Sequence, residues 1–120
     1  MSRAERPLDA ITSYHAHVYY EAATREDAAL VRERLAERFA VQLGRWHDRP
    51  VGPHPQPMYQ IAFAVEVFPT LVPWLMLNRL GLAVLVHPNT DNPRDDHLVH
   101  ALWMGRMLTL DVSGLPASLS

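Results

Sequence analysis

The segment from Ile11 to Tyr20 restricts the fold most strongly, because apolar and polar residues alternate along it. A β-strand sends successive side chains to opposite faces, so this alternation predicts a strand with two unlike faces. One face presents the imidazoles of His15 and His17 beside Tyr19. The other face is suited to packing on a core, and it carries Tyr14, Ala16, Val18 and Tyr20.

Helical and alternating patterns follow one another along the next part of the chain. Thr24 and Asp27 form an acidic variant of the capping box, and apolar residues then recur at helical spacing. Residues 48–57 contain four prolines and one glycine, a composition that indicates a stiff loop. The predicted elements are a strand at 11–20, a helix at 25–40, a strand at 41–47, a strand at 58–68, a helix at 70–80 and a strand at 82–87.

This order of elements, βαββαβ, is typical of the ferredoxin-like α+β fold, an antiparallel sheet with two helices on one face. Asn92 and Pro93 resemble an N-cap and a first helical residue, which predicts a short additional helix. Residues 107–112 are suited to an edge strand. A domain usually has about 100–200 residues. We therefore expect one domain over 1–120, with loose tails at 1–9 and 113–120.

Composition and charge exclude several classes of protein. The eleven basic residues are all arginine, they do not cluster, and the net charge is −2, so nucleic acid is not an expected partner. The chain has no cysteine, and residues 1–9 lack an apolar stretch typical of a signal peptide, so we expect a cytoplasmic protein. The most apolar stretch, 61–77, is interrupted by Glu66, Pro69 and Pro73, which argues against membrane insertion.

Strand parity predicts that several of the seven histidines share the open face of the sheet. His15 and His17 lie on that face, and antiparallel pairing of the first and fourth strands brings His87 to the same region. The same parity places the carboxylate of Glu66 on this face. Imidazoles with an oxygen ligand and open positions are the arrangement by which non-haem iron activates dioxygen. The alternative interpretation is an exposed polar pair without a metal.

Two other histidine-containing segments are candidates for the same site. His54 is flanked by prolines, whose fixed φ angles restrict the backbone that presents its ring. Asp95 and Asp96 open the predicted short helix, with His97 and His100 one turn apart, so a carboxylate could orient an imidazole there. A proline-rich turn and a helix start with favourable acids explain these segments equally well.

Five short stretches in chain order carry a family resemblance. They are Tyr14-His-Ala-His-Val-Tyr-Tyr20, Trp46-His-Asp-Arg-Pro-Val-Gly-Pro-His-Pro55, Leu85-Val-His-Pro-Asn-Thr90, Asp96-His97 and Ala101-Leu-Trp-Met-Gly105. With these stretches the sequence resembles the DOPA 4,5-dioxygenase family. The family usually has Gly-Asp after the threonine of the third stretch, where this chain has Asp91-Asn92.

The resemblance implies a metal-dependent extradiol dioxygenase that opens the ring of a catechol such as DOPA or a related catecholic acid. The family's histidines correspond to His17, His54, His87 and His97. We assign His17, His87 and His54 to the metal, with His54 and His97 as the alternatives for acid and base catalysis. The metal implied is Fe(II), which zinc can replace in a purified sample. The remaining candidates are His15, Glu66, Asp96 and His100, with Arg94 for a substrate carboxylate.

A second function stays open at the level of sequence. A protein of the same fold could hold a metal ion or a small aromatic ligand without turning it over. A homodimer that buries the open sheet face is expected under either function. If the protein is a dioxygenase, a small aromatic substrate and dioxygen are its expected partners.

Overall fold

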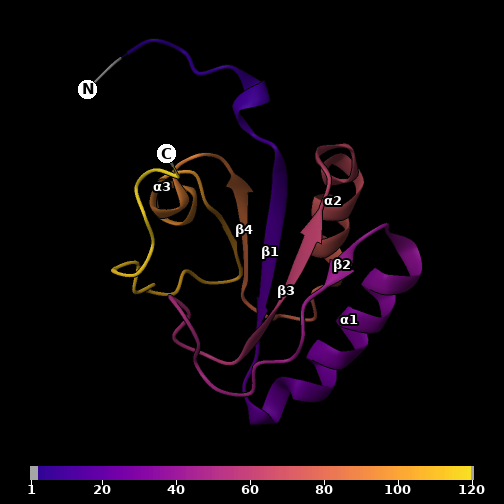
Figure 1. The fold of residues 1–120 in the computed structure, drawn as a ribbon. Coiled ribbons are helices and arrows are strands. Elements are labelled where there is room, and N and C mark those ends of the chain that lie inside the picture. The colour runs from indigo at the N-terminus through magenta and orange to yellow at the C-terminus, as the bar shows by residue number, and fades with distance from the viewer. Residues whose placement is uncertain (1–2, 120) are drawn as a thin grey trace.

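The structure, a computed structural model, describes residues 3–119, so residues 1, 2 and 120 of the predicted tails lie outside the described residues. A five-stranded antiparallel sheet carries helices on both faces (Figure 1). This architecture confirms the predicted α+β class and the βαββαβ order, with one helix and one strand added. The elements are β1 (Ser13–Tyr19), α1 (Arg25–Arg38), β2 (Gln42–Leu43), β3 (Met58–Phe63), α2 (Phe68–Asn78), β4 (Val84–Asn89), α3 (Pro93–Leu98) and β5 (Leu102–Met104).

The histidine-bearing strand β1 lies at the centre of the sheet, whose strand order is β2-β3-β1-β4-β5. It pairs antiparallel with β3 on one side and with β4 on the other. The register places His15 opposite His87 on β4 and His17 opposite Gln60 on β3. Directly paired residues point to the same face of an antiparallel sheet. The predicted meeting of the first and fourth strands is therefore confirmed.

Helices α1 and α2 cover one face of the sheet (Figure 1). The buried residues of α1, Ala28, Val31 and Leu35, recur at helical spacing and pack in one cluster with Ala16 and Val18 of β1. This face of the sheet is the main hydrophobic core, which fixes the opposite face as the one that bears the histidines. Within residues 3–119, no helix combines the length and the apolar character required to span a membrane.

The histidine-bearing face is partly covered by α3 and by the segment that follows β5 (Figure 1). Leu108 and Leu110 of that segment pack on a second, smaller cluster that contains Tyr19 and Leu85. The face that the sequence predicts to be open is therefore open only in part. A cleft remains beside the histidines.

The predicted edge strand at 107–112 is wrong, because these residues form no strand and β5 takes the edge position beside β4. Gly105 follows β5 with a φ of +81°, a conformation that glycine adopts without strain, and the chain turns away from the sheet there. Within the tail predicted at 113–120, the described residues make backbone contacts with the rest of the chain. The amide of Leu119 donates to the carbonyl of Asp91 at 2.9 Å.

Strand β3 and helix α2 differ from their predicted bounds. The alternating pattern continues to Phe68, but β3 ends at Phe63, opposite Tyr14 near the start of β1, so its β1 pairing ends there. A 3-10 turn at Val65–Val67 then leads directly into α2. Glu66 is exposed on this turn, so the strand parity that placed it among the histidines does not hold.

Two further strand bounds need correction. Only Gln42–Leu43 of the strand predicted at 41–47 forms a regular strand, β2. Further along the chain, His47 pairs with Met58 of β3 through an isolated β-bridge. Strand β4 does not end at Pro88 but continues to Asn89. β5 pairs with β4 only at positions 84–86, so a residue without an N–H is tolerated beyond them.

Candidate functional site

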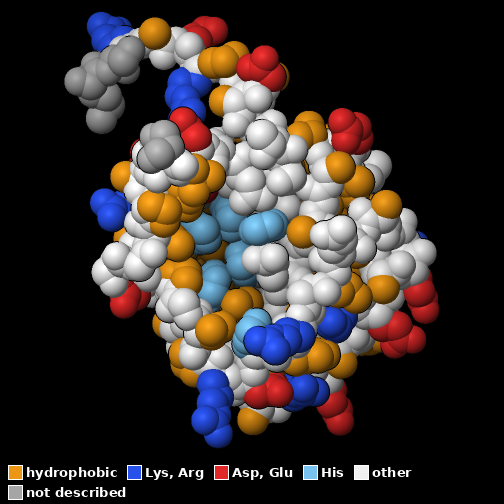
Figure 2. Space-filling view, viewed as in Figure 1, with side chains coloured by type: hydrophobic (Ala, Val, Ile, Leu, Met, Phe, Trp, Pro, Cys, Tyr) orange, Lys and Arg blue, Asp and Glu red, His pale blue; other side chains and the backbone are white. Residues whose placement is uncertain are grey.

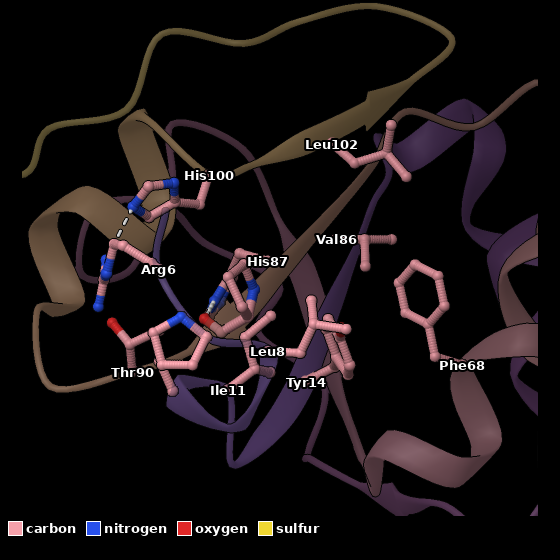
Figure 3. A pocket seen from close by; sticks show the side chains of 13 residues that line it. Arg6, Leu8, Ile11, Tyr14, Phe68, Val86, His87, Thr90, His100 and Leu102 are labelled. Atoms are coloured by element: carbon pink, nitrogen blue, oxygen red, sulfur yellow. Dashed lines mark hydrogen bonds between the residues drawn. The ribbon is translucent and has the colours of Figure 1, made fainter. Parts of the chain in front are cut away.

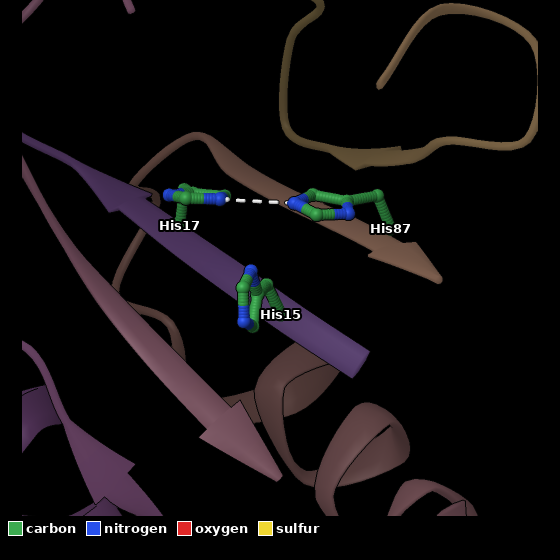
Figure 4. Close-up of side chains that lie close together, drawn as sticks. All are labelled: His15, His17 and His87. Carbon is green, nitrogen blue, oxygen red and sulfur yellow. Dashed lines mark hydrogen bonds between the residues drawn. The ribbon is translucent and has the colours of Figure 1, made fainter. Parts of the chain in front are cut away.

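Three imidazoles from the two central strands converge at the base of the site (Figure 4). His15 and His17 come from β1 and His87 from β4. One ring nitrogen from each lies within 4.8 Å of the others, and Nε2 of His17 is 3.1 Å from Nε2 of His87. Strand register and side-chain parity produce this convergence directly, since His15 and His87 are paired residues.

The separation of these nitrogens fits a metal ion. Imidazole nitrogens bind transition metals at about 2.0–2.1 Å, so two of them at octahedral to tetrahedral angles lie about 2.8–3.4 Å apart. The 3.1 Å between His17 and His87 falls within this interval. His87 donates from Nδ1 to the carbonyl oxygen of Pro88 at 2.9 Å, which leaves the Nε2 lone pair of the neutral ring for an ion.

His17 completes this pair but has an unusual feature. Since Nε2 of His87 carries a lone pair, the 3.1 Å contact without an ion requires His17 to donate from its own Nε2. The buried Nδ1 of His17 then has no hydrogen-bond partner among residues 3–119. A bound ion would replace the hydrogen bond between the two rings, so both nitrogens are suited to the role of ligand.

Two more histidines line the same site from outside the sheet. The ring of His97, on α3, lies 3.9 Å from the ring of His87 between centroids, and its Nδ1 donates to the carbonyl oxygen of Pro93 at 2.7 Å. The ring of His54, from the proline-rich loop, lies 4.3 Å from that of His17. The four histidines that the family pattern implies therefore meet at one place.

Burial lowers the pKa of four of the cleft imidazoles, those of His15, His17, His54 and His87. Burial, followed by repulsion from His97, lowers the pKa of His87 to about 3. Burial, again followed by His97, lowers the pKa of His54 to about 4. Burial and the surrounding histidines hold the pKa of His17 well below its ordinary value, and burial also lowers the pKa of His15. Neutral rings near pH 7 offer the lone pairs that a metal ion requires.

The histidines line a cleft of about 460 Å³ between the sheet and the segment formed by α3 and the C-terminal residues. Figure 2 shows the histidine side chains gathered in a hollow on this face. Leu115 and Leu119 line the cleft with Pro53 and Pro93. Polar groups at its base and apolar groups at its rim are the composition expected for a small-molecule site.

The secondary candidates fall in different places. The buried carboxylate of Asp96 lines the cleft and accepts hydrogen bonds from the amide and hydroxyl of Thr90, so it holds this turn. Within residues 3–119 it makes no hydrogen bond to an imidazole. Arg94 is exposed on α3 and does not line the cleft. Glu66 lies outside it as well. His100 borders a neighbouring hollow.

The sequence profile of the DOPA 4,5-dioxygenase family matches residues 14–114, most of the chain and all of the cleft histidines. The chain belongs to this family. A crystal structure of a Nostoc punctiforme protein named as a candidate dioxygenase is 54% identical, with a TM-score of 0.89, and the match covers 90% of this chain and 94% of that one.

Two curated relatives are more distant. The DOPA 4,5-dioxygenase of Amanita muscaria is 34% identical over 115 residues, which cover 88% of this chain and 50% of the relative. An uncharacterized 21.2 kDa protein of Botryotinia fuckeliana is 35% identical over 113 residues, which cover 84% of this chain and 62% of the relative. The chain therefore spans only part of the length of these relatives of the DOPA 4,5-dioxygenase family.

A second hollow of about 310 Å³ adjoins the cleft of this family member (Figure 3). Its lining is mostly apolar, and His87 and Thr90 line both spaces. Arg6 and His100 lie at the polar end of this hollow, and Nη1 of Arg6 is 3.5 Å from Nε2 of His100. Arg6 also lines a third hollow, which shares Thr12, Thr90 and Leu119 with the cleft.

Some residues of the site were missed by reasoning from the sequence. Tyr19 shares the face of His15 and His17 by strand parity, and this signal was available. Leu115 and Leu119 carried no such signal, because they reach the cleft only through the folding back of the C-terminal segment. Arg6 lies in the segment expected to be a loose tail.

Proposed function

We propose that the chain is a metal-dependent extradiol dioxygenase that opens the ring of a catechol such as DOPA or a related catecholic acid. The observation that carries the proposal is the convergence of ring nitrogens of His15, His17 and His87 at the base of a cleft. Membership of the DOPA 4,5-dioxygenase family supports the reaction class.

We assign the metal to His17 and His87, with His15 as the third ligand suggested by the geometry and His54 as the alternative from the family pattern. Fe(II) is the metal proposed, and zinc is a substitute that a purified sample can carry. A bound Fe(II) ion would orient the catechol oxygens and dioxygen and stabilise the charge that develops on them. Imidazole ligands suit both metals.

The other cleft histidines are proposed to serve the substrate. His97 keeps its Nε2 lone pair, because its Nδ1 donates to the carbonyl oxygen of Pro93, so it can accept the proton of a catechol hydroxyl. His54 is the candidate for returning a proton. Leu115 and Leu119 line one side of the cleft and offer apolar contact to an aromatic ring.

Arg6 is better placed than Arg94 to bind the carboxylate of a catecholic acid. It lines two hollows that adjoin the cleft at Thr90, whereas Arg94 lines none of these three spaces. Asp91 also lines one of these hollows and offsets part of the positive charge. We therefore propose that the ring binds among the histidines and that the side chain of the substrate points past Thr90.

The direct test is anaerobic loading of the purified protein with Fe(II), followed by DOPA, caffeate or protocatechuate and then air. Oxygen uptake together with a yellow ring-opened product supports the proposal. Tight metal binding without oxygen uptake on any catechol would favour instead the alternative, a protein that holds a metal ion or a small aromatic ligand.

A further inference from the structure

The hydroxyl of Tyr19 lies 2.6 Å from Nδ1 of His54, and both side chains are buried. Within residues 3–119 this hydroxyl has no other hydrogen-bond partner, and its ring stacks on Trp103 at 5.7 Å between centroids. A buried hydroxyl that finds no acceptor is costly, by about 1–3 kcal/mol. The O–H of Tyr19 therefore donates, and Nδ1 of His54 accepts.

The direction of this hydrogen bond determines the tautomer of His54. A neutral imidazole carries one proton, and since Nδ1 accepts, the proton is on Nε2. Nε2 of His54 makes no hydrogen bond within residues 3–119 and is not among the buried atoms that lack a partner, so it is accessible from the cleft. His54 thus presents a donor to the cleft, not a lone pair.

The neighbouring histidines have the opposite arrangement. His87 and His97 each donate from Nδ1 to a backbone carbonyl oxygen, of Pro88 and Pro93 respectively. Their Nε2 atoms therefore carry lone pairs, which suit a metal ion or an acidic hydroxyl. Hydrogen bonds thus give His54 the opposite tautomer from that of His87 and His97.

The loop that carries His54 is held in place by backbone hydrogen bonds. The amide of His54 donates to the carbonyl of Val51 at 3.1 Å, and the amide of Asp111 donates to the carbonyl of Pro53 at 2.9 Å. The segment that covers Tyr19 therefore also fixes the backbone beside His54. Ring and hydroxyl are positioned before any ligand binds.

We propose that Tyr19 is a positioning residue that fixes His54 as a hydrogen-bond donor, so that His54 contacts an oxygen atom of the cleft ligand and does not bind the metal. The identity of that ligand, a catechol, rests on the proposed function. Tyr19 itself touches neither the ligand nor the metal.

The test is ¹⁵N NMR of the histidine rings in the 120-residue chain without metal. Protonated and unprotonated imidazole nitrogens differ widely in chemical shift, so the tautomer is read directly. We expect His54 to be protonated on Nε2 in the wild type and to redistribute toward Nδ1 in Tyr19→Phe. Protonation on Nδ1 in the wild type, or an unchanged His54 in Tyr19→Phe, would overturn the proposal.

Tyr20→Phe is the matched control, because it removes a buried tyrosine hydroxyl that bonds Asp48 and the carbonyl of His47, outside the cleft. It should leave the His54 spectrum unchanged. Metal analysis gives a second readout: His54→Gln should retain one ion per chain, and His87→Gln should lose it. Loss of the ion in both would show that His54 is a ligand, against the proposal.

Measurements of catalytic activity allow the role proposed for Tyr19 to be tested separately from the proposed function. In an active enzyme, Tyr19→Phe should lower kcat about 10- to 100-fold, the usual effect of removing a partner that orients a functional histidine, with little change in KM. Wild-type protein that opens no catechol would contradict the proposed function, while the NMR result would still decide the tautomer of His54.

Discussion

His17 and His87 are 70 positions apart in the sequence, and their Nε2 atoms are 3.1 Å apart in the structure. Strand parity and the antiparallel rule are sufficient to predict that they meet, because both depend only on backbone geometry. The family resemblance implied His54 as the third metal ligand, whereas the ring nitrogen that lies within 4.8 Å of those of His17 and His87 belongs to His15. His15 lies there because it is paired directly with His87, and one residue of register would have changed that outcome.

Removal of a proposed ligand should abolish metal binding. His17→Ala and His87→Ala are each expected to weaken Fe(II) or zinc binding by more than about 100-fold, since outer partners of ligands alone account for 10- to 100-fold. Isothermal titration of the metal-free protein measures this. His47→Ala is the control, because His47 does not line the cleft, and it should bind as the wild type does.

The contact proposed for a substrate carboxylate should appear in substrate selectivity. Arg6→Gln is expected to raise KM for DOPA about tenfold, as for loss of one charged hydrogen bond, and to leave KM for uncharged 4-methylcatechol unchanged. Arg94→Gln should change neither value. Equal effects of the two variants, or an Arg6→Gln effect on both substrates, would argue against the contact.

The buried histidines should make the metal-free protein sensitive to acid. The folded-state pKa values of His87 and His54, about 3 and about 4, lie below the ordinary value of 6.5. As pH falls below 6.5 the unfolded chain binds protons that the folded chain excludes, so stability falls between pH 6.5 and these lower values and is constant above.

The acid effect is measurable by urea unfolding at pH 7 and pH 5, a range that largely avoids carboxylate titration. The free energy of unfolding should decrease by on the order of 1–2 kcal/mol for each such histidine. His54→Gln should show a shallower decrease. A wild-type stability that is equal at the two pH values would contradict the buried neutral state.

At the scale of elements, periodicity predicted the position of each helix and strand of the βαββαβ core but not all of their ends. The alternation of 58–68 runs past Phe63, and only the start of β1 opposite decides where β3 stops. The sequence pattern of edge strand β5 does not favour a strand more than the pattern of residues 107–112 does. Such ends depend on tertiary partners, which local sequence does not specify.

The buried face of α1 gives a prediction at this scale. Leu35 is fully buried in the main core, whereas Leu30 on the same helix is 38% exposed. Leu35→Ala should lower the free energy of unfolding by about 2–5 kcal/mol, and Leu30→Ala by less than about 1 kcal/mol. Chemical denaturation of the two variants measures the difference, and equal losses would contradict the assigned packing.

At the scale of the whole molecule, the cleft exists because the chain folds back over its own sheet. α3 and the segment after β5 cover part of the face that the sequence predicts to be open. The backbone amide of Leu119 is hydrogen-bonded to the carbonyl of Asp91. Sequence reasoning missed this cover, since it has little regular structure and no periodic pattern to reveal it. The same cover occupies part of the surface expected for a dimer.

A homodimer in the cytoplasm stays a prediction from the sequence. Exposed apolar residues near the edge strand, among them Val99 and Leu102, offer surface outside the cleft for such contact. Sedimentation equilibrium should give twice the mass of the 120-residue chain. A single-chain mass up to high micromolar concentration would contradict the dimer and would leave the cleft chemistry unaffected.

We expect the histidine cleft to support ring opening by dioxygen. Iron-loaded protein should be mixed with DOPA under ¹⁸O₂, and the product trapped by rapid reduction before its aldehyde exchanges oxygen with water. Mass spectrometry should then detect a ring-opened product that contains both ¹⁸O atoms in the wild type and none of that product in His87→Ala. Oxygen uptake that yields only an unlabelled quinone, or no uptake at all, would contradict the claim.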